Sequence, residues 1–468
     1  MAESRAGLPR GRMAGYGAAE LGITAIEFFL QFYLLKFYTD VVRLEADIAG
    51  LALALAMVWD ALTDPLMGTI SDQTRSRWGK RRLYILLGAP ILGASFVLLF
   101  SPPALDTQAA KFAFLLVSYL LVNTGMTIIA VPHAALGGEL SADVDERTEI
   151  FGWRFLFTNL GLVLGIVLPG LVAAYAGGGP NGRVTASATP ASYLVALVLV
   201  AAAGVTCWAT RGLDKPSVEV AVTLRRYLRA LAATMTNRPF LVLVAAYVLG
   251  SAARAVNAAV ALFYYEYRLG LAEADVLLYV LLPFGCLIAA SIILWLRLAH
   301  RYGKRRPAVW GIFALGLLTA VGYAILPKHG LTGPIIVAVV GGVLVGAVFL
   351  LDSTVADVVD YDEVWTGSHR EGMYFGFWRL STKLARAVGL AASGLLLEAI
   401  GFDGAHTVQS PETEFGLAMI FGPGVGGMFM IAALVYLFMP LDRDRVRRVR
   451  RILDLRRARR ARRAAASP

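Results

Sequence analysis

Long apolar runs separated by short polar connections extend along the whole chain. Each run has about 20 residues or more, the length that an α-helix needs to cross roughly 30 Å of hydrocarbon. We place twelve of them, beginning near residues 14, 47, 83, 111, 150, 191, 239, 273, 307, 333, 371 and 414. The pattern predicts an all-α membrane protein with twelve transmembrane helices.

The composition supports this prediction. Of the 468 residues, 57% are hydrophobic and only 16% are charged, and the mean hydropathy is +0.64. A soluble core of this size uses far less apolar surface. The two cysteines, Cys207 and Cys286, both fall within apolar runs and indicate neither a disulfide framework nor a metal site. No cleavable signal sequence is expected ahead of the first run.

The net charge of +11 is distributed unevenly between the connections. Basic residues collect in alternate connections, as the positive-inside rule describes for cytoplasmic loops. They include Arg5, Arg10 and Arg12, then residues 75–82, 215–238 and 297–306, and finally the tail from Arg443 to Arg463. We therefore expect a multi-pass protein of the cell membrane with both termini in the cytoplasm. The basic tail after Pro440 predicts a solvated or lipid-surface helix, and nucleic acid is not an expected partner.

The two halves of the chain repeat each other. The turn Arg77-Trp-Gly-Lys-Arg-Arg82 recurs as Arg301-Tyr-Gly-Lys-Arg-Arg306, each time after an even-numbered run. A second match, between residues 151–154 and 375–379, has nearly the same offset. The repeats predict a tandem duplication of six spans. Two six-helix bundles related by an axis along the membrane normal, with a substrate site between them at the midplane, are the design of the major facilitator fold.

This interpretation divides the chain into four parts. We predict an N-terminal six-helix bundle at residues 1–211, a cytoplasmic linker at 212–238, a C-terminal six-helix bundle at 239–440 and a basic cytoplasmic tail at 441–468.

Two carboxylates interrupt the second apolar run. An ionisable residue at membrane depth costs roughly 2.5 to 3.5 kcal/mol on insertion scales, so Asp60 and Asp64 need a partner or a function. They are four residues apart and share one helix face, with the hydroxyl of Thr63 beside them. In the fourth run, Thr127 precedes Pro132, which disturbs the helix and frees a backbone carbonyl.

Hard oxygen donors of this kind suit a hard cation. The pattern predicts a site for a sodium ion or a proton, and for sodium the metal ligands would be Asp60 and Asp64. A purely structural pair, bonded to a basic residue of another helix, is the alternative.

Polar residues form a stripe along the first run. Glu20, Thr24, Glu27 and Gln31 follow the helical spacing i, i+4, i+7, i+11, and we expect them to face a central cavity and contact the substrate. Mere hydration of the two glutamates is the alternative.

Four basic residues also fall within apolar runs: Arg154, Arg254, Lys383 and Arg386. Arg154 is about one turn into the fifth run, where it either contacts substrate or extends its side chain to the membrane surface. Lys383 is some twelve residues into the eleventh run, too deep for such an extension. We expect it to reach toward substrate or toward the carboxylates of the second run.

Several motifs carry a resemblance to a known family. They are Tyr38-Thr-Asp-Val41, Trp59-Asp-Ala-Leu-Thr-Asp-Pro65, Thr74-Arg-Ser-Arg-Trp-Gly-Lys80, Val131-Pro132, Asp357-Val-Val-Asp-Tyr-Asp-Glu363 and Lys383. At these residues the chain resembles the glycoside-pentoside-hexuronide:cation symporter family of the major facilitator superfamily, typified by melibiose permease. The resemblance implies a cation site at Asp60, Thr63, Asp64 and Thr127. It also matches the family's basic residues of the fifth and eleventh spans with Arg154 and Lys383.

The chain departs from the family at two positions. Melibiose permease binds its sugar with acids in the first and fourth spans, and the matching residues here are Thr24 and Ala130. This difference disfavours melibiose itself as a substrate. The stretch from Glu27 to Leu35 instead resembles the sodium-dependent lysophospholipid carriers. Two substrate classes therefore stay open: a sugar or glycoside-like solute, and a lysophospholipid.

An enzyme or a sensor is the alternative from another class. The five histidines are scattered along the sequence, and no phosphate-binding glycine loop of the Walker type is present, which also disfavours transport driven by ATP. We expect a monomeric, non-enzymatic symporter without a cofactor, whose partners are its small solute, the coupling cation Na⁺ or H⁺, and membrane lipids. The sequence leaves the substrate and the coupling ion open.

Overall fold

The computed structural model describes residues 8–141, 144–175, 187–213, 234–367, 371–406 and 408–465. Residues 214–233, which make up most of the predicted linker, lie outside these ranges.

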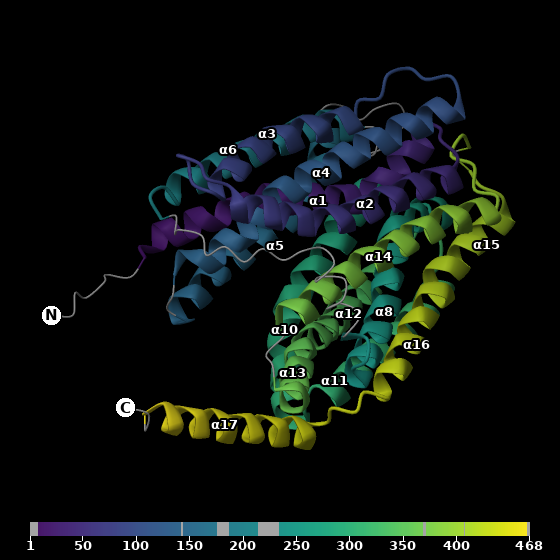
Figure 1. The fold of residues 1–468 in the computed structure, drawn as a ribbon. Helices are drawn as coiled ribbons and strands as arrows, with labels where there is room; N and C mark the ends of the chain where they lie inside the picture. The colour runs from purple at the N-terminus through teal and green to yellow at the C-terminus, as the bar shows by residue number, and fades with distance from the viewer. Residues whose placement is uncertain are drawn as a thin grey trace.

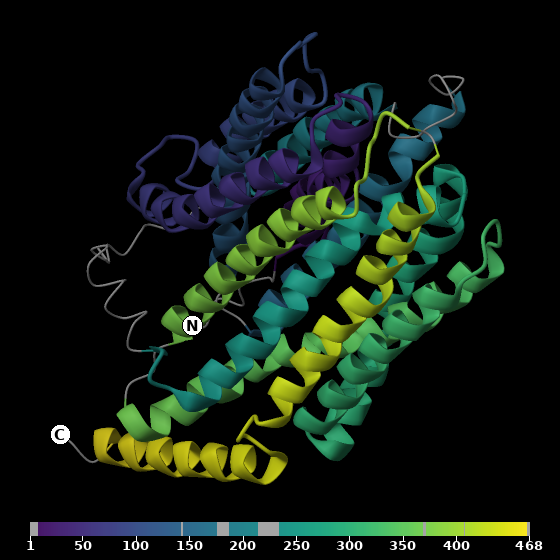
Figure 2. The same cartoon turned by 90° about the vertical axis from the view of Figure 1, so that its right-hand side faces the viewer.

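The described chain is helical and forms two bundles (Figure 1). The first bundle contains α1 (Arg10–Asp40), α2 (Ala46–Gln73), α3 (Arg82–Leu99), α4 (Gln108–Leu140), α5 (Val144–Tyr175) and α6 (Ala188–Ala209). The second contains α8 (Arg238–Phe263), α9 (Glu273–Asp275), α10 (Leu282–Tyr302), α11 (Arg305–Ile325), α12 (Thr332–Val345), α13 (Phe349–Thr366), α14 (Glu371–Ala399), α15 (Pro411–Met419) and α16 (Val425–Leu437). Helix α17 (Arg443–Ala465) lies across the foot of the second bundle (Figure 2).

Twelve spans are long and apolar enough to cross a membrane among the residues that the structure describes. The seventh span continues α8 into a π-helical turn, Tyr264–Arg268. The eighth, tenth and twelfth spans each join two of the helices above through a short π-helical or 3₁₀ turn. The largest difference from the predicted start is four residues, at the first span, which begins at Arg10. The prediction of a twelve-span, all-α membrane protein is therefore confirmed.

The two repeated basic turns have the same backbone feature. Gly79 in the first turn and Gly303 in the second have φ angles of 91° and 79°, a left-handed conformation that glycine adopts without a steric penalty. Gly303 ends α10, where a residue with positive φ is a common helix terminator.

The lysine of each basic turn pairs with an acid of the same bundle. The ammonium of Lys80 lies 3.1 Å from Glu139 at the end of α4, and that of Lys304 lies 2.7 Å from Asp357 in α13. The fourth and tenth spans occupy equivalent places in the two halves. The sequence repeat therefore corresponds to a repeated ion pair in the structure.

The bundles touch closely on the side opposite the chain ends. A side-chain Cβ at Gly394 of α14 would lie 2.2 Å from the carbonyl oxygen of Ala46, and one at Gly50 of α2 would lie 2.9 Å from the Cα of Gly394. The two helices thus pack backbone against backbone, which requires small residues. Both chain ends lie on the left in Figure 1, away from this contact.

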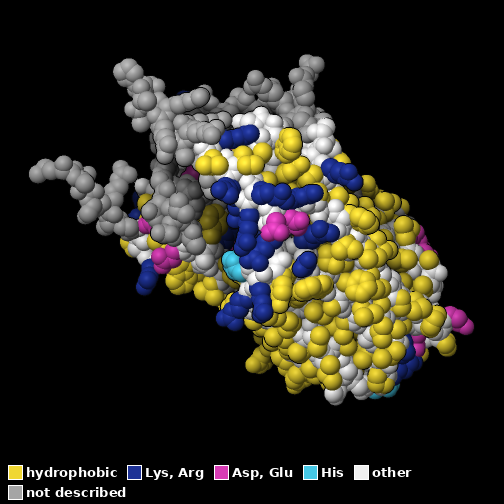
Figure 3. Space-filling view, turned by 90° about the horizontal axis from the view of Figure 1, so that it is seen from below, with side chains coloured by type: hydrophobic (Ala, Val, Ile, Leu, Met, Phe, Trp, Pro, Cys, Tyr) yellow, Lys and Arg dark blue, Asp and Glu magenta, His cyan; other side chains and the backbone are white. Residues whose placement is uncertain are grey.

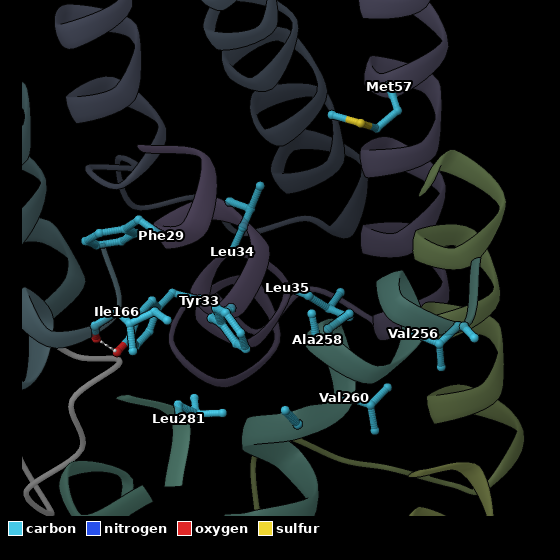
Figure 4. Packing of buried hydrophobic residues seen from close by; sticks show 14 of the residues in the cluster. Phe29, Tyr33, Leu34, Leu35, Met57, Ile166, Val256, Ala258, Val260 and Leu281 are labelled. Atoms are coloured by element: carbon cyan, nitrogen blue, oxygen red, sulfur yellow. Dashed lines mark hydrogen bonds between the residues drawn. The ribbon is translucent and has the colours of Figure 1, made fainter. Parts of the chain in front are cut away.

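Helix α1 is central to the packing (Figure 4). The hydroxyl of Tyr33 donates a hydrogen bond of 2.8 Å to the carbonyl of Ile166 in α5. Figure 4 shows Leu35 of α1 beside Ala258 of the second bundle. Leu34, Ala258 and Leu281 line a cavity of about 740 Å³ between the bundles. Residues of both bundles form its wall, so the fold places one shared space where the predicted site was expected.

Candidate functional site

The carboxylates of α2 and a hydroxyl of α4 converge at the cavity. Asp60 and Asp64 are one helical turn apart and both line it, and Asp60 is only 6% exposed. The hydroxyl oxygen of Thr127 lies 2.9 Å from Oδ1 of Asp60 and 3.1 Å from Oδ1 of Asp64, so its hydrogen bond is shared between them. Thr63 lies beside this group, with its hydroxyl oxygen 3.4 Å from that of Thr127.

Lys383 of α14 reaches this group from the other bundle. Its Nζ lies 2.6 Å from Oδ2 of Asp60 and 2.5 Å from Oδ2 of Asp64. One ammonium thus faces two carboxylates, and the group of three side chains carries one formal negative charge. The structure brings together the residues expected at the cation site, and it places Lys383 where its depth in the sequence suggested. Their role in cation binding stays a prediction.

The acid nearest the start of α1 has two basic neighbours. The guanidinium of Arg154 in α5 holds Glu20 through two hydrogen bonds, of 2.9 Å to Oε2 and 3.0 Å to Oε1. Nδ1 of His133, which is fully buried in α4, lies 3.1 Å from Oε2 of the same carboxylate. Arg154 therefore does not extend to the membrane surface, and the interpretation of Glu20 as merely hydrated is wrong.

Glu27 forms a second link between the bundles. Its Oε1 accepts a 2.7 Å bond from Nη1 of Arg386 in α14. Both side chains line the cavity, as does Gln31. Arg386 is one turn beyond Lys383, so α14 supplies cations to acids of both α1 and α2.

The expectation that Thr24 faces the cavity is wrong. Thr24 is buried, is not among the lining residues, and lies against α5, where a Cβ at Gly161 would come within 2.9 Å of the Thr24 Cβ. At this level of the helix, α5 packs against the side of α1 that carries Thr24 and separates it from the cavity.

Two basic residues near the charged groups, His133 and Arg379, were not among the predicted site residues. His133 was counted only among the scattered histidines; it lies against Glu20 because α4 packs beside α1, and it does not line the cavity. Arg379 of α14 lines the cavity, one turn before Lys383, and the i, i+4 spacing could have identified it.

The charged and apolar parts of the cavity lie on different walls. The acids and bases come from α1, α2, α5, α8 and α14. The eighth, ninth, tenth and twelfth spans contribute mainly apolar side chains, which include Val280, Leu281, Phe284, Ile288, Leu315, Leu318, Val337, Val345, Phe421 and Phe429. The cavity can thus hold a solute that has both a polar part and an apolar part.

A separate charged cluster closes the side opposite the chain ends. Lys36 of α1 is fully buried, and its ammonium contacts Asp40 of the same helix, Glu266 at 2.5 Å and Glu273 at 3.5 Å. The hydroxyl of Tyr267 donates a 2.7 Å hydrogen bond to Asp40. Because Glu266, Tyr267 and Glu273 belong to the second bundle, these contacts hold the two bundles together beyond the cavity.

Comparison with known proteins assigns the family. Residues 15–443 match the model of a family described as MFS/sugar transport protein. The chain belongs to this family. It is 28% identical to the putative glycoside/cation symporter YagG of Escherichia coli, over 90% of this chain and 91% of that one. It is 29% identical to the isoprimeverose transporter of Lactiplantibacillus pentosus, over 88% and 84%.

The comparisons of this member of the sugar transport family also include a symporter named for a lysophospholipid and a solved structure with a similar fold. A sodium-dependent lysophosphatidylcholine symporter 1-A of Danio rerio is 27% identical over 90% of this chain and 83% of its own. Among solved structures, a bacterial homolog of the human lysosomal transporter Spinster superposes with a TM-score of 0.71 over 92% of this chain and 96% of that one, at 13% identity. The structural likeness establishes the shared major facilitator fold.

Proposed function

We propose that this protein is a secondary symporter that moves a sugar or glycoside-like solute together with a cation, sodium or a proton, by alternating access. The observation that carries the proposal is the contact of Lys383 with both Asp60 and Asp64 across the two bundles. It links a group of oxygen ligands in one bundle to a cavity-lining helix of the other. The relatives named as a glycoside/cation symporter and an isoprimeverose transporter support the substrate class.

The geometry suggests how cation and solute binding are coupled. In the absence of a cation, Lys383 balances one of the two negative charges. A cation bound by Asp60, Asp64 and the Thr127 hydroxyl shares the charge of the acids, so the ammonium is released toward the cavity. Lys383 can then bind an oxygen of the solute. Each ligand changes the affinity of the other by the same factor, as linkage requires.

The contacts between the bundles determine how the cavity opens to the side opposite the chain ends. For the opposite side to open, Lys36 must separate from Glu266 and Glu273, and Arg386 from Glu27. Rocking of one bundle against the other around a fixed site is the general mechanism for this fold. We assign the side of the chain ends to the cytoplasm, on the basis of the distribution of arginine and lysine between the loops. The protein acts as a monomer in this proposal.

Uptake into proteoliposomes tests the proposal. The purified chain is reconstituted, and radiolabelled sugars and glycosides are presented under an imposed sodium gradient, an imposed proton gradient, or neither. We expect a sugar-like solute to accumulate above its external concentration with one of the gradients only, and Asp64→Asn to remove this accumulation. Equal uptake without any gradient, in wild type and variant alike, would contradict cation coupling.

A lysophospholipid is the second candidate substrate. The apolar wall built by α10, α11 and α12 favours it, since this surface suits an acyl chain, and so does the lysophosphatidylcholine symporter among the relatives. The same proteoliposomes, with labelled lysophosphatidylcholine and a sodium gradient, separate the two candidates. If excess sugar reduces the uptake of labelled lysophosphatidylcholine, the sugar-like solute is supported as the substrate. Sodium-driven lipid uptake that excess sugar does not reduce would support the lysophospholipid.

A further inference from the structure

Helix α17 carries nearly all of the excess positive charge of the chain. It contains twelve arginines and two aspartates, Asp444 and Asp454, so its formal charge is +10, whereas that of the whole chain is +11. Its 23 residues form a rod about 34 Å long. The transport function proposed above makes no use of this charge.

One face of α17 attaches it to the second bundle. Val449 and Leu453 are buried, and Nη2 of Arg450 lies 2.8 Å from Oδ1 of Asp357 in α13. Near the end of α13, the carbonyl of Val364 accepts a 2.8 Å hydrogen bond from an arginine of α17. These contacts fix the helix across the end of the tenth span.

The opposite face of α17 combines arginines with aliphatic side chains. At about 100° per residue, Arg448, Arg451, Ile452 and Leu455 fall within an arc of roughly 100°, turned away from the buried valine and leucine. All four are exposed, Ile452 by 40% and Leu455 by 55%. A helix that only contacts water gains nothing from two exposed aliphatic residues beside its arginines. Helices that lie in the membrane interface have this combination.

The position of α17 relative to the spans agrees with an interfacial location. The tenth span ends at Thr366, two residues beyond the carbonyl that α17 contacts. Arg443 at the start of α17 donates a 2.7 Å hydrogen bond to the carbonyl of Arg301, in the last turn of the eighth span. Figure 3 views this end of the molecule and shows lysine and arginine side chains gathered on it, next to a broad hydrophobic surface. The helix therefore lies at the level where lipid headgroups begin.

We propose that the outer face of α17 binds the anionic headgroups of the surrounding lipid leaflet. Arginine guanidinium groups pair with phosphate in a bidentate manner, and the aliphatic side chains of Ile452 and Leu455 extend among the upper acyl carbons. A nucleic acid would use the arginines but would have no contact for the aliphatic pair, which favours lipid as the ligand.

Lipid retention by the full-length protein tests this inference. The purified chain in neutral detergent is titrated with phosphatidylglycerol or phosphatidylcholine, and the retained lipids are counted by native mass spectrometry. We expect the wild type to prefer phosphatidylglycerol. Arg447 is also exposed and lies about 40° outside the arc of the outer face. A variant with Arg447→Gln, Arg448→Gln and Arg451→Gln is expected to lose roughly tenfold to a hundredfold in apparent affinity for that lipid, since each arginine near an anionic surface contributes to binding.

A matched control variant removes three charges from other exposed positions on the same side. The variant with Arg77→Gln, Arg297→Gln and Arg306→Gln is expected to keep the wild-type preference. An equal loss in both variants would mean that total charge decides binding, and it would overturn the assignment to α17. Preserved preference in the α17 variant would overturn it as well.

Two further arms separate the lipid from other anions. The variant Ile452→Ser with Leu455→Ser keeps every charge, and we expect it to retain less phosphatidylglycerol while its thermal unfolding temperature stays that of the wild type. If glycerol phosphate or a short RNA competes with phosphatidylglycerol as well as the lipid itself does, and the aliphatic variant binds normally, α17 recognises soluble anions and the inference is wrong.

Discussion

Replacement of Lys383 by alanine removes a cation that contacts both carboxylates of α2 from the other bundle. At an effective dielectric constant of about 20, two unit charges 4 Å apart interact by about 4 kcal/mol. The Lys383 side chain is 24% exposed and that of Asp64 is 27% exposed, so solvent reduces this figure. We take a coupling of about 1 to 3 kcal/mol, which corresponds to a roughly 5- to 150-fold effect of one ligand on the affinity for the other.

The variant should therefore lose coupling rather than binding. In the wild type, a saturating cation is expected to lower the Kd of the solute by a factor within that range. In Lys383→Ala the factor should fall to within about twofold of one, while the cation alone binds more tightly because its competitor is gone. Titration of solute with and without the cation, followed by calorimetry or intrinsic fluorescence, gives the factor directly.

A neighbouring cation supplies the control. Arg379 lines the same cavity one turn earlier on α14, but no carboxylate of the described residues lies within ion-pair distance of it. Arg379→Ala should keep the wild-type coupling factor even if its affinity for solute changes. A full wild-type coupling factor in Lys383→Ala would refute the reasoning and would leave that lysine with a packing role.

Three further variants test other parts of the account. Asp60→Asn should abolish accumulation driven by the cation gradient yet permit solute exchange at equal concentrations; preserved accumulation would argue against its role. Gly394→Val should lower the thermal unfolding temperature by several degrees, because the added Cβ would lie 2.2 Å from the Ala46 carbonyl oxygen. Gly427→Val is the control, since a Cβ there meets open space, and it should not lower that temperature. Equal unfolding temperatures for the two variants would count against the close contact. Lys36→Met should destabilise the protein at neutral pH, since three carboxylates lose their cation, and acid should restore stability by protonating them; a pH-independent effect would contradict this.

The helices and the acids of α2 could be predicted from the sequence because each depends on local information. The length of an apolar run determines whether it spans a membrane. The i, i+4 spacing of Asp60 and Asp64 determines that they share a face. The depth of Lys383 in its span already demanded a negative partner. In these cases one helix alone carries enough information.

The remaining contacts depend on how helices are rotated against each other. The pairing of Glu27 with Arg386 joins residues 359 positions apart, and nothing local selects that partner. Thr24 satisfied the spacing of the polar stripe, yet the close approach of α1 to Gly161 turned it away from the cavity. His133 became part of the site only because α4 packs beside α1. Rotation and packing of this kind are set by many small side-chain contacts, which single-sequence spacing does not encode.

The most direct test of the central claim is cation binding to the purified chain without solute. Calorimetric titration with sodium at several pH values should give saturable binding in the wild type, weaker at acidic pH if protons compete for the same carboxylates. Asp60→Asn and Asp64→Asn should show no saturable heat, and Thr127→Ala a reduced affinity. If the proton is the coupling ion, the wild type should instead take up protons on solute addition, because each ligand raises the affinity for the other, and the two aspartate variants should not. Wild-type sodium binding, or wild-type proton exchange, in both aspartate variants would contradict the assignment of the coupling site to α2.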